Sequence, residues 1–344
     1  MPAADDSIVE TVRDANRARR NLAALQAHLG AEFERLAAVL ARQLPRTADP
    51  DMALNNLERL FAQPASRPHL KELLASRGRG LEAALHLLAA SQFFADTLAA
   101  YPELLEAIRS PQRRSPTVPE LAAELRSAMD AAADDAGVLR AIRRFRARHQ
   151  LRIGISDIVR DRPLEEVARE LSRLADAAVE AALAFALRAA AQRSGKPMTA
   201  EGKPACLTAF AFGKLGGDEL NYSSDIDLMF LYDHDGATAG KRTSLSNAEF
   251  FAEVIRTVVR LLSQDTDRGI AYRVDLRLRP EGQRGPLVRS LANTLSYYDT
   301  RGRTWERQAL IKLRPIAGDP ALGREFLSAI EPFIYRKYFS FAEI

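Results

Sequence analysis

The sequence predicts an α+β fold in which an N-terminal α-helical bundle is followed by a domain of mixed strands and helices. Only 6 of the 18 glycines lie before Glu201, in a region rich in the helix-forming residues Ala, Leu, Arg and Glu. The spacing of apolar residues also changes there, from intervals of three and four residues to alternation. The 344 residues exceed the roughly 250–300 at which single cores begin to divide, so we expect domains over 1–200 and 201–344.

The helical half carries amphipathic stripes, of which Leu57, Leu60 and Phe61 form one. The longest stripe begins after Pro163 and runs towards Gly195. Proline is favoured in the first turn of a helix and glycine just after its end, so these two residues predict the limits of a long helix. We therefore expect a helical bundle over residues 1–195.

The mixed half contains three expected strands and several expected helices. Leu207–Phe212 is a short apolar run, whereas Asp225–Tyr232 and Tyr272–Leu278 alternate in polarity. Ser246 and Glu249 have the spacing of a capping box, which predicts the start of a helix. Shorter helical patterns follow at 290–299, 304–311 and 321–330.

Composition excludes several classes of protein. Hydrophobic residues make up 47% of the chain and charged residues 27%, which is ordinary for a globular protein and excludes disorder. The single cysteine, Cys206, excludes a disulfide framework and indicates a reducing, cytoplasmic location. No apolar run approaches the roughly 20 residues of a membrane span, and the acidic N-terminus does not resemble an export signal.

The net charge of +4 suits phosphate-bearing ligands without requiring nucleic acid, which is not an expected partner. Four arginines, however, lie close together on one expected helix. Such a run predicts a solvated basic face, with an acidic protein partner as the next alternative and RNA as the last. These residues are Arg143, Arg144, Arg146 and Arg148.

Two aspartates mark the start of the second expected strand. Residues two apart on a strand share a face, so Asp225 and Asp227 point the same way, about 7 Å apart along the chain. Carboxylates this close raise each other's pKa unless a cation lies between them. Mg²⁺ prefers carboxylate and phosphate oxygens, so the pair is a candidate metal site. The alternative is a solvated strand edge.

A glycine-rich turn precedes these aspartates. Gly213, Gly216 and Gly217 let backbone N–H groups approach phosphate oxygens, and Lys214 adds a cation. The turn has neither the P-loop pattern nor the dinucleotide-binding fingerprint. Ser223 and Ser224 are further candidates for phosphate contact, although serines before a strand also close turns.

A third aspartate lies on the last expected strand. Alternation over Tyr272–Leu278 places Asp275 on the same face as Arg273, Arg277 and Arg279. If this strand neighbours the one that begins at Asp225, Asp275 completes a three-carboxylate cluster that can hold two Mg²⁺ ions. The alternative is that Asp275 pairs with the arginines, which then form a solvated basic face.

A glycine turn, an Asp-x-Asp strand and a third Asp on a later strand are typical of the nucleotidyltransferase fold. The segment Gly213–Leu228 resembles the signature of the bifunctional glutamine synthetase adenylyltransferase/adenylyl-removing enzyme family. The resemblance covers roughly residues 50–344. Its other segments are Ala53–Arg59, Tyr101–Leu105, Val274–Pro280, Gly285–Val288 and Gly302–Lys312.

The resemblance implies one of two activities. Members of this family carry an N-terminal domain that removes AMP from a tyrosine of glutamine synthetase by phosphorolysis, releasing ADP, and a C-terminal domain that adds AMP from ATP. This sequence has one such domain and ends at Phe341–Ile344, where the family continues, so we expect a fragment or a shortened relative. Asn221–Ser224 and Trp305–Lys312 resemble the removing domain more closely.

The resemblance implies that Asp225, Asp227 and Asp275 are the catalytic Mg²⁺ ligands. Expected partners are adenylylated glutamine synthetase, ATP or ADP with phosphate, and a PII signalling protein. The alternatives are the forward adenylyltransferase and a non-catalytic module that binds nucleotide or PII; retention of all three carboxylates argues against the latter. The residues expected to contact nucleotide or phosphate are Gly213, Lys214, Gly216, Gly217, Ser223, Ser224, Arg277 and Arg279.

Overall fold

The computed structural model describes residues 2–75, 79–109, 114–240 and 244–335, without the side chains of residues 2–5 and 79. The Phe341–Ile344 segment therefore lies outside the described residues. The chain divides into two compact units. One contains Met1–Ser115 and Ala147–Val167, and the other contains Pro116–Arg146 and Ala168–Ile344.

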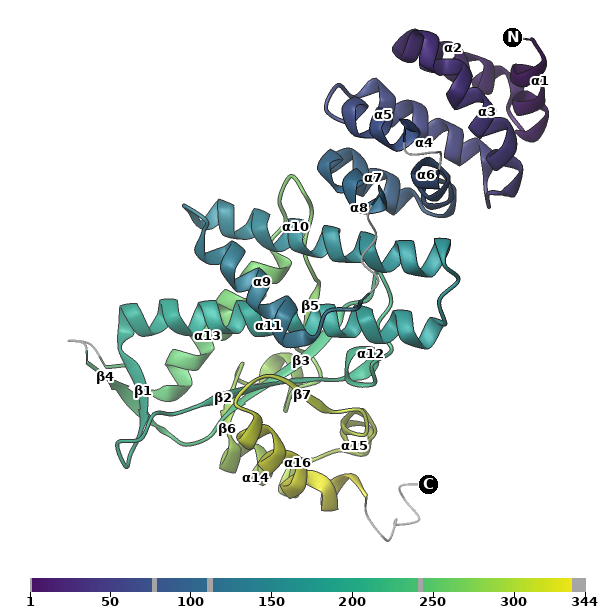
Figure 1. Cartoon of the computed structure of the whole chain (residues 1–344). Coiled ribbons are helices and arrows are strands. Elements are labelled where there is room, and N and C mark those ends of the chain that lie inside the picture. Colours follow the sequence, from purple (N-terminus) through teal and green to yellow (C-terminus); the bar gives the residue numbers. More distant parts are fainter. Residues whose placement is uncertain (1, 76–78, 110–113, 241–243, 336–344) are drawn as a thin grey trace. The chain divides into compact units, whose positions relative to one another are not determined.

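The first unit is helical (Figure 1). Asp14 and Asp49 cap α2 and α4, because their carboxylates accept hydrogen bonds from the N–H groups of Arg17 and Met52. The helices are α1 (Pro2–Thr11), α2 (Ala15–Leu29), α3 (Phe33–Gln43), α4 (Pro50–Ala62), α5 (Arg67–Ala75), α6 (Arg79–Ala90), α7 (Gln92–Ala100) and α8 (Leu105–Arg109).

Three helices carry the chain into the second unit: α9 (Val118–Asp130), α10 (Asp135–Gly154) and α11 (Leu164–Ser194). The long helix expected between Pro163 and Gly195 is confirmed as α11. None of the helices in the described part of the chain is long and apolar enough to cross a membrane.

The second unit is built on a five-stranded mixed sheet. Four strands follow the order β5 (Val274–Asp275), β3 (Ile226–Tyr232), β2 (Leu207–Ala211) and β7 (Arg314–Gly318). β2 is antiparallel to both of its neighbours, whereas β3 and β5 are parallel. The fifth strand, β6 (Arg289–Ser290), also pairs with β3 in parallel.

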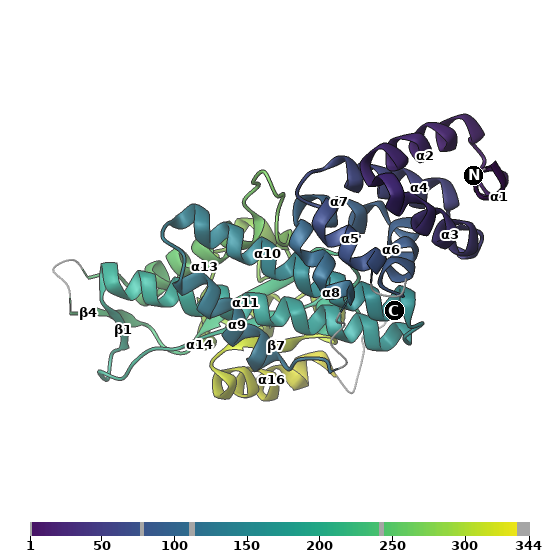
Figure 2. The same ribbon diagram turned by 45° about the horizontal axis from the view of Figure 1, so that its top comes forward.

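Helices cover both faces of this sheet (Figures 1 and 2). α9 and α11 lie on one side, and the C-terminal helices lie on the other. Met229 and Leu231 of β3 join the core formed with the C-terminal helices, to which Tyr298 and Phe326 contribute. These helices are α14 (Leu291–Arg301), α15 (Thr304–Leu310) and α16 (Pro320–Ile334).

The remaining elements of the second unit include a pair of short strands and two helices. β1 (Lys196–Thr199) and β4 (Gly236–Ala239) form a separate antiparallel pair. α13 (Asn247–Ser263) begins with the capping box expected at Ser246, which confirms that prediction. The glycine turn contains one short helix, α12 (Gly213–Gly216).

The expected α+β class is confirmed, but the strand expected over Tyr272–Leu278 is wrong in length. Only Val274–Asp275 pairs as β5. The N–H of Arg277 donates to the Asp275 carboxylate (2.7 Å), and the N–H of Arg279 donates to the Leu276 carbonyl (3.3 Å). Because these backbone donors are used within the segment, the chain turns away from the sheet after Asp275.

The compact units divide the chain differently from the expected domain limits. β1 begins at Lys196, so strands do start near residue 200. However, α9, the first part of α10 and most of α11 belong to the same compact unit as the strands. The limits 1–200 and 201–344 stay a prediction about domains.

Candidate functional site

The glycine turn lies directly against β3. The N–H of Phe212 donates to the carbonyl of Asp227 (2.9 Å), and Gly213 follows with a φ of +56°. A methyl carbon at Gly213 would lie 2.9 Å from Oδ2 of Asp227. Glycine is therefore required here both for the backbone conformation and for the close approach of a carboxylate.

The other two glycines of the turn face different surroundings. A methyl carbon at Gly216 would lie 2.0 Å from the carbonyl oxygen of Lys312 and 2.7 Å from that of Ala211. At Gly217 it would meet only side-chain atoms, at 3.1 Å or more. Packing against neighbouring backbone thus explains why a glycine stands at position 216. Lys214, on the same turn, is exposed.

The parallel pairing of β3 and β5 brings two of the three predicted carboxylates together. The register places Asp227 beside Asp275, with Ile226 beside Val274. The condition set for a carboxylate cluster, that these two strands are neighbours, is therefore met. Asp225 lies immediately before β3, two residues from Asp227.

The electrostatics of the carboxylates reflects this proximity. Burial raises the pKa of Asp227, and the negative charges of Asp275 and Asp225 raise it further, while Arg277 opposes the shift. The hydrogen bond from Arg277, by contrast, lowers the pKa of Asp275. Positive charge therefore lies closest to the outer two carboxylates, Asp225 and Asp275, which have arginine partners, whereas the pKa of Asp227 is raised on balance.

Those arginine partners are close. Nε of Arg273 lies 3.1 Å from Oδ1 of Asp225, and Nε of Arg277 lies 2.7 Å from Oδ2 of Asp275. Both arginine side chains are about 70% exposed, at 70% and 68%. The Arg273–Asp225 pair is exposed on both sides, so a ligand can separate it at small cost, whereas Asp275 is only 14% exposed.

The donor set fits a hard divalent cation, although it is not arranged as a finished metal site. Within the described ranges, no three His, Cys, Asp or Glu side chains are grouped as metal ligands. The mutual repulsion of Asp225, Asp227 and Asp275 is nevertheless the kind that Mg²⁺ relieves. In this structure Arg273 and Arg277 partly neutralise the outer two carboxylates.

A cleft of about 450 Å³ opens over the outer two carboxylates, and Asp227 is not among its lining residues. Asp225, Asp275 and their two arginine partners line it, together with Val259 from α13. Its walls thus combine negative charge, exposed guanidinium groups and an apolar surface. This combination is suited to a metal ion with phosphate oxygens.

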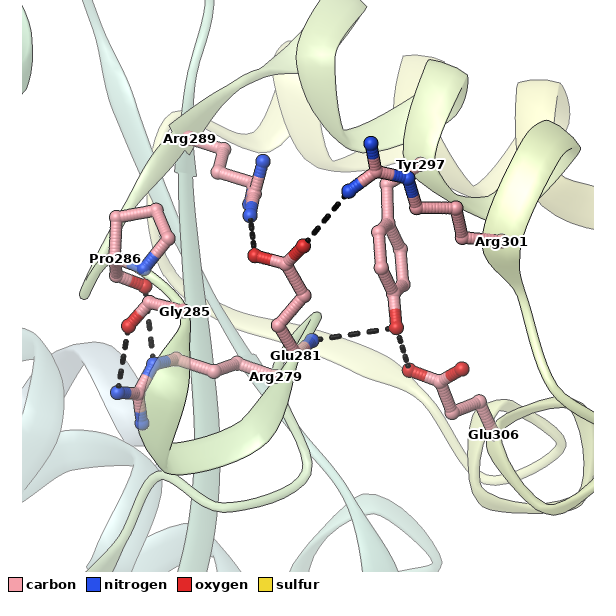
Figure 3. A network of polar contacts seen from close by, with 8 residues as sticks. All are labelled: Arg279, Glu281, Gly285, Pro286, Arg289, Tyr297, Arg301 and Glu306. Carbon is pink, nitrogen blue, oxygen red and sulfur yellow. Dashed lines mark hydrogen bonds and ion pairs between the residues drawn. The ribbon is translucent and has the colours of Figure 1, made fainter.

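Arg279 has a different environment from Arg277. Only 8% of it is exposed, and its guanidinium donates to three carbonyls of its own loop, of which Figure 3 shows those of Gly285 and Pro286. The distances are 2.7 Å to Leu276, 3.1 Å to Gly285 and 3.0 Å to Pro286. These contacts indicate that Arg279 holds the loop after β5 in place, and phosphate contact by Arg279 stays a prediction.

A second set of contacts holds the same loop from outside (Figure 3). The N–H of Glu281, a residue with a φ of +62°, donates to the Tyr297 hydroxyl (3.3 Å). That hydroxyl donates to Oε1 of Glu306 (2.9 Å), which is 1% exposed. The Glu281 carboxylate binds Arg289 and, at 3.1 Å, Arg301. Glu306 is therefore part of this network.

The two predicted serines also differ. Ser224 donates to Oδ1 of Asn221 at 2.5 Å, and its own N–H donates to the Asn221 carbonyl (3.3 Å). These contacts close a turn, as the alternative interpretation of the sequence proposed. Ser223 is exposed beside it. A phosphate contact by either serine stays a prediction.

Several residues that lie at the site in the structure are not candidates from the sequence. The sequence places Arg273 on the same strand as Asp275, and in the structure it pairs with Asp225. Asp176 and Arg314 form an ion pair next to the glycine turn, at 2.6 Å. Arg273 had a local signal, its spacing from Asp275. The other pair had none, since its members are separated by 138 residues.

The segment after α14 presents apolar side chains to solvent beside the buried network. Trp305 is 46% exposed and Ile311 is 56% exposed, while Glu306 between them is buried. α15 thus has one face fixed to the core and another open.

A family model described as glutamate-ammonia ligase adenylyltransferase matches residues 81–329. The chain belongs to this family. The match includes the glycine turn, all three aspartates and the network around Glu281. The glutamate-ammonia ligase adenylyltransferase family thus accounts for most of the chain, including every site residue predicted from the sequence.

Curated relatives of the family agree with this assignment. The chain is 41% identical over 222 residues to a bifunctional glutamine synthetase adenylyltransferase/adenylyl-removing enzyme of Thioalkalivibrio sulfidiphilus, covering 64% of the chain and 23% of the relative. It is 41% identical over 243 residues to the same enzyme of Pseudomonas aeruginosa, covering 70% and 25%. For the enzyme of Nitrosococcus oceani the identity is 44% over 204 residues, covering 59% and 21%.

The matched part of the chain spans about a quarter of the length of these relatives, at 21–25%. Their name contains both an adenylyl-transferring and an adenylyl-removing activity. Family membership therefore leaves the direction of the reaction to be argued from the residues themselves.

Proposed function

We propose that this chain catalyses the Mg²⁺-dependent removal of AMP from an adenylylated tyrosine of glutamine synthetase by phosphorolysis, with release of ADP. The observation that carries this proposal is the register of β3 and β5, which sets Asp227 beside Asp275 next to the glycine turn. The family assignment supports the substrate. The direction rests on Asn221–Ser224 and Trp305–Lys312, which resemble the removing domain.

The reaction forms one bond and breaks another. An oxygen of inorganic phosphate bonds to the phosphorus of tyrosyl-AMP, and the bond from that phosphorus to the tyrosine oxygen breaks. The attacking phosphate becomes the β-phosphate of ADP, and the tyrosine oxygen takes up a proton to regain its hydroxyl. Such a transfer needs alignment and charge neutralisation more than covalent chemistry.

The residues that line the cleft, with Asp227 and Lys214 close by in the chain fold, can meet both needs. Asp225, Asp227 and Asp275 would hold Mg²⁺, which when bound neutralises charge on the phosphate oxygens. Arg277 is exposed at the cleft wall and can exchange its carboxylate partner for a phosphate oxygen. Lys214, exposed on the glycine turn, adds positive charge near the same strand.

The deciding experiment supplies both possible substrates in the presence of Mg²⁺. Adenylylated glutamine synthetase is incubated with and without phosphate, and unmodified synthetase is incubated with ATP. Phosphate-dependent release of ADP supports the proposal, whereas incorporation of AMP from ATP alone replaces it with the forward transferase. If nucleotide binds but neither reaction occurs, the chain acts as a sensor module, and binding of a PII protein is then tested.

Replacement of Asp227 by asparagine tests the metal ligands. We expect Asp227→Asn to lower turnover by at least about 10³-fold, because charge stabilisation by a metal is worth several kcal/mol. The melting temperature should change little, since burial and like charges already disfavour the ionised carboxyl. Turnover and thermal unfolding are measured on the same samples.

The matched control is Asp267→Asn, which removes the same charge from a side chain that is 76% exposed. It should leave turnover within about twofold of the wild type, as surface substitutions usually do. Full activity of Asp227→Asn would remove Asp227 from the metal site.

We further propose a cytoplasmic location, on the basis of the single cysteine and the family.

A further inference from the structure

One face of α11 carries a row of polar side chains that contact the sheet domain. Ser172, Asp176 and Glu180 are spaced by four residues, so they lie one above another on the helix. Oγ of Ser172 accepts the N–H of Leu220 (3.1 Å), and Oε2 of Glu180 accepts the N–H of Gly318 (2.9 Å). Asp176, between them, binds Arg314.

The Asp176–Arg314 pair reaches the glycine turn. Nη1 and Nη2 of Arg314 lie 2.6 and 3.2 Å from the two carboxylate oxygens of Asp176. Nη2 also donates to the Leu215 carbonyl at 2.9 Å, and Nε to that of Gly216 at 3.4 Å. The same guanidinium lies 3.1 Å from Oδ1 of Asp218. One arginine therefore joins α11 to two consecutive positions of the turn, Leu215 and Gly216, and to Asp218 just after it.

The α11 side of this linkage is shielded from water. Asp176 is 3% exposed and Ser172 is 0% exposed. Burial raises the pKa of Asp176 to about 6 although Arg314 opposes the shift, so the carboxyl is mostly ionised at neutral pH. A buried ion pair with two hydrogen bonds fixes the orientation of both side chains. Loss of Arg314 would leave the buried Asp176 carboxylate without its ion-pair partner, whereas after loss of Asp176 the guanidinium of Arg314 still lies beside Asp218.

The glycine turn also contacts Asp227 and holds it in place. The N–H of Phe212 donates to the Asp227 carbonyl, and Gly213 lies against the Asp227 carboxylate. We propose that Asp176 and Ser172 are positioning residues, which act through Arg314 and Leu220 to hold the segment from Gly213 to Leu220 at a fixed place beside Asp227. The role in turnover rests on the proposed function, whereas the placement of the turn does not.

The experiment compares three variants of the same helix. Asp176→Asn removes the charge that orients Arg314, and Ser172→Ala removes the acceptor of the Leu220 N–H. Glu180→Ala is the matched control, because it removes a similar contact to β7 at Gly318, away from the turn. Amide hydrogen exchange of residues 213–220 is measured by mass spectrometry, and kcat and KM with adenylylated glutamine synthetase are measured separately.

We expect exchange at the turn to accelerate about tenfold or more in Asp176→Asn and Ser172→Ala, with no comparable change in β3. kcat should fall about tenfold or more, since small misplacements of reacting groups have effects of this size. Glu180→Ala should leave both quantities within about twofold of the wild type. Unchanged exchange at the turn, or an equal acceleration throughout the unit in all three variants, would overturn the proposal.

The two proposals fail separately. If the wild type does not release ADP from adenylylated synthetase, the proposed function fails, and exchange alone decides the placement of the turn. If Asp176→Asn does not fold, Ser172→Ala still decides it, because its side chain is neutral and its loss leaves no buried charge.

Discussion

Gly216 illustrates how single residues fix the geometry of the candidate site. From the sequence, Gly216 and Gly217 are equivalent members of a phosphate-binding turn. In the structure Gly216 faces the backbone oxygens of Lys312 and Ala211, whereas Gly217 faces the movable side chains of Lys312 and Glu219. The two neighbours therefore differ in how much space they leave for a side chain.

A pair of alanine substitutions measures this difference. We expect Gly216→Ala to lower the free energy of unfolding by about 2 kcal/mol or more, because backbone cannot move aside as easily as a side chain can. Gly217→Ala should cost less than about 1 kcal/mol, since the flexible ends of Lys312 and Glu219 can shift. Chemical denaturation gives both values, and equal costs would contradict the packing argument.

Cys206 is a second residue whose behaviour follows from its immediate contacts. Its thiol donates to Oδ2 of Asp233 at 3.3 Å. Burial, the hydrogen bond to Asp233 and the charge of that carboxylate raise the pKa of the thiol to about 12 from an ordinary 9.0. The thiolate is the reactive form, so the cysteine is expected to be inert at neutral pH.

We expect the native protein to react with a maleimide at pH 8 at least about 100-fold more slowly than the unfolded chain, because the thiolate fraction is reduced. Asp233→Asn should accelerate the native reaction. Since the folded pKa exceeds the unfolded one, the folded state retains the proton between about pH 9 and 12, and this group's contribution to stability is lost as pH rises through that window. An equal rate in both states would refute the assigned environment.

At the scale of elements, α10 shows why the basic run was misread. Arg143 is 3% exposed, and its guanidinium donates to the carbonyls of Gly269 (3.0 Å), Leu261 (2.9 Å) and Gln264. Arg146 lies over the ring of Tyr272 at 4.9 Å. These two residues hold the connection from α13 to β5, so the prediction of a solvated basic face is wrong for Arg143 and Arg146, while Arg144 and Arg148 are exposed.

Arg143→Met should therefore lower the free energy of unfolding by about 3 kcal/mol or more, because several buried carbonyls lose a charged donor at once. Arg140→Met is the control from the same helix, since its ion pair with Asp134 is 64% exposed on the arginine side. The control should cost less than about 1 kcal/mol. Thermal unfolding and denaturant unfolding should both show a larger loss of stability for Arg143→Met than for Arg140→Met.

The strand after α13 shows a different limit of sequence patterns. Alternation in Tyr272–Leu278 correctly indicates that Asp275 lies on a strand, which the structure pairs with β3, but it overstates the length of that strand. Periodicity reports which faces side chains prefer, whereas the end of a strand here depends on donors captured by the Asp275 carboxylate and by the Leu276 carbonyl. Arg279 consequently lies inside the loop instead of beside Arg277.

At the scale of the whole molecule, the change in composition near residue 200 predicted the start of the strands but not the grouping of the helices. The apolar residues of α11 repeat as in any buried helix, and this pattern predicts that α11 belongs to a helical bundle. Its contacts at Ser172, Asp176 and Glu180 are made with residues more than 40 positions later. The local sequence holds no signal for such partners, although the α+β class and the three aspartates were predictable from it.

Two shortened chains test how the molecule is divided. We expect a chain of residues 116–344 to unfold cooperatively, because it retains α9, α10 and α11 with the sheet. A chain of residues 201–344 should fail to do so, since Arg314 would lose Asp176 and the core would lose the cover of α11. Circular dichroism during thermal unfolding distinguishes them. Cooperative unfolding of the shorter chain would instead support a domain limit near residue 200.

The half-exposed position of Trp305 gives the protein a built-in optical reporter. It is the only tryptophan of the chain, and its neighbour Glu306 is fixed in the buried network. The indole therefore occupies one defined place on α15, partly hydrated and partly packed. Its fluorescence can be followed without any label: a partner that covers α15 should shift the emission to shorter wavelength, whereas a small ligand confined to the cleft should leave it in place.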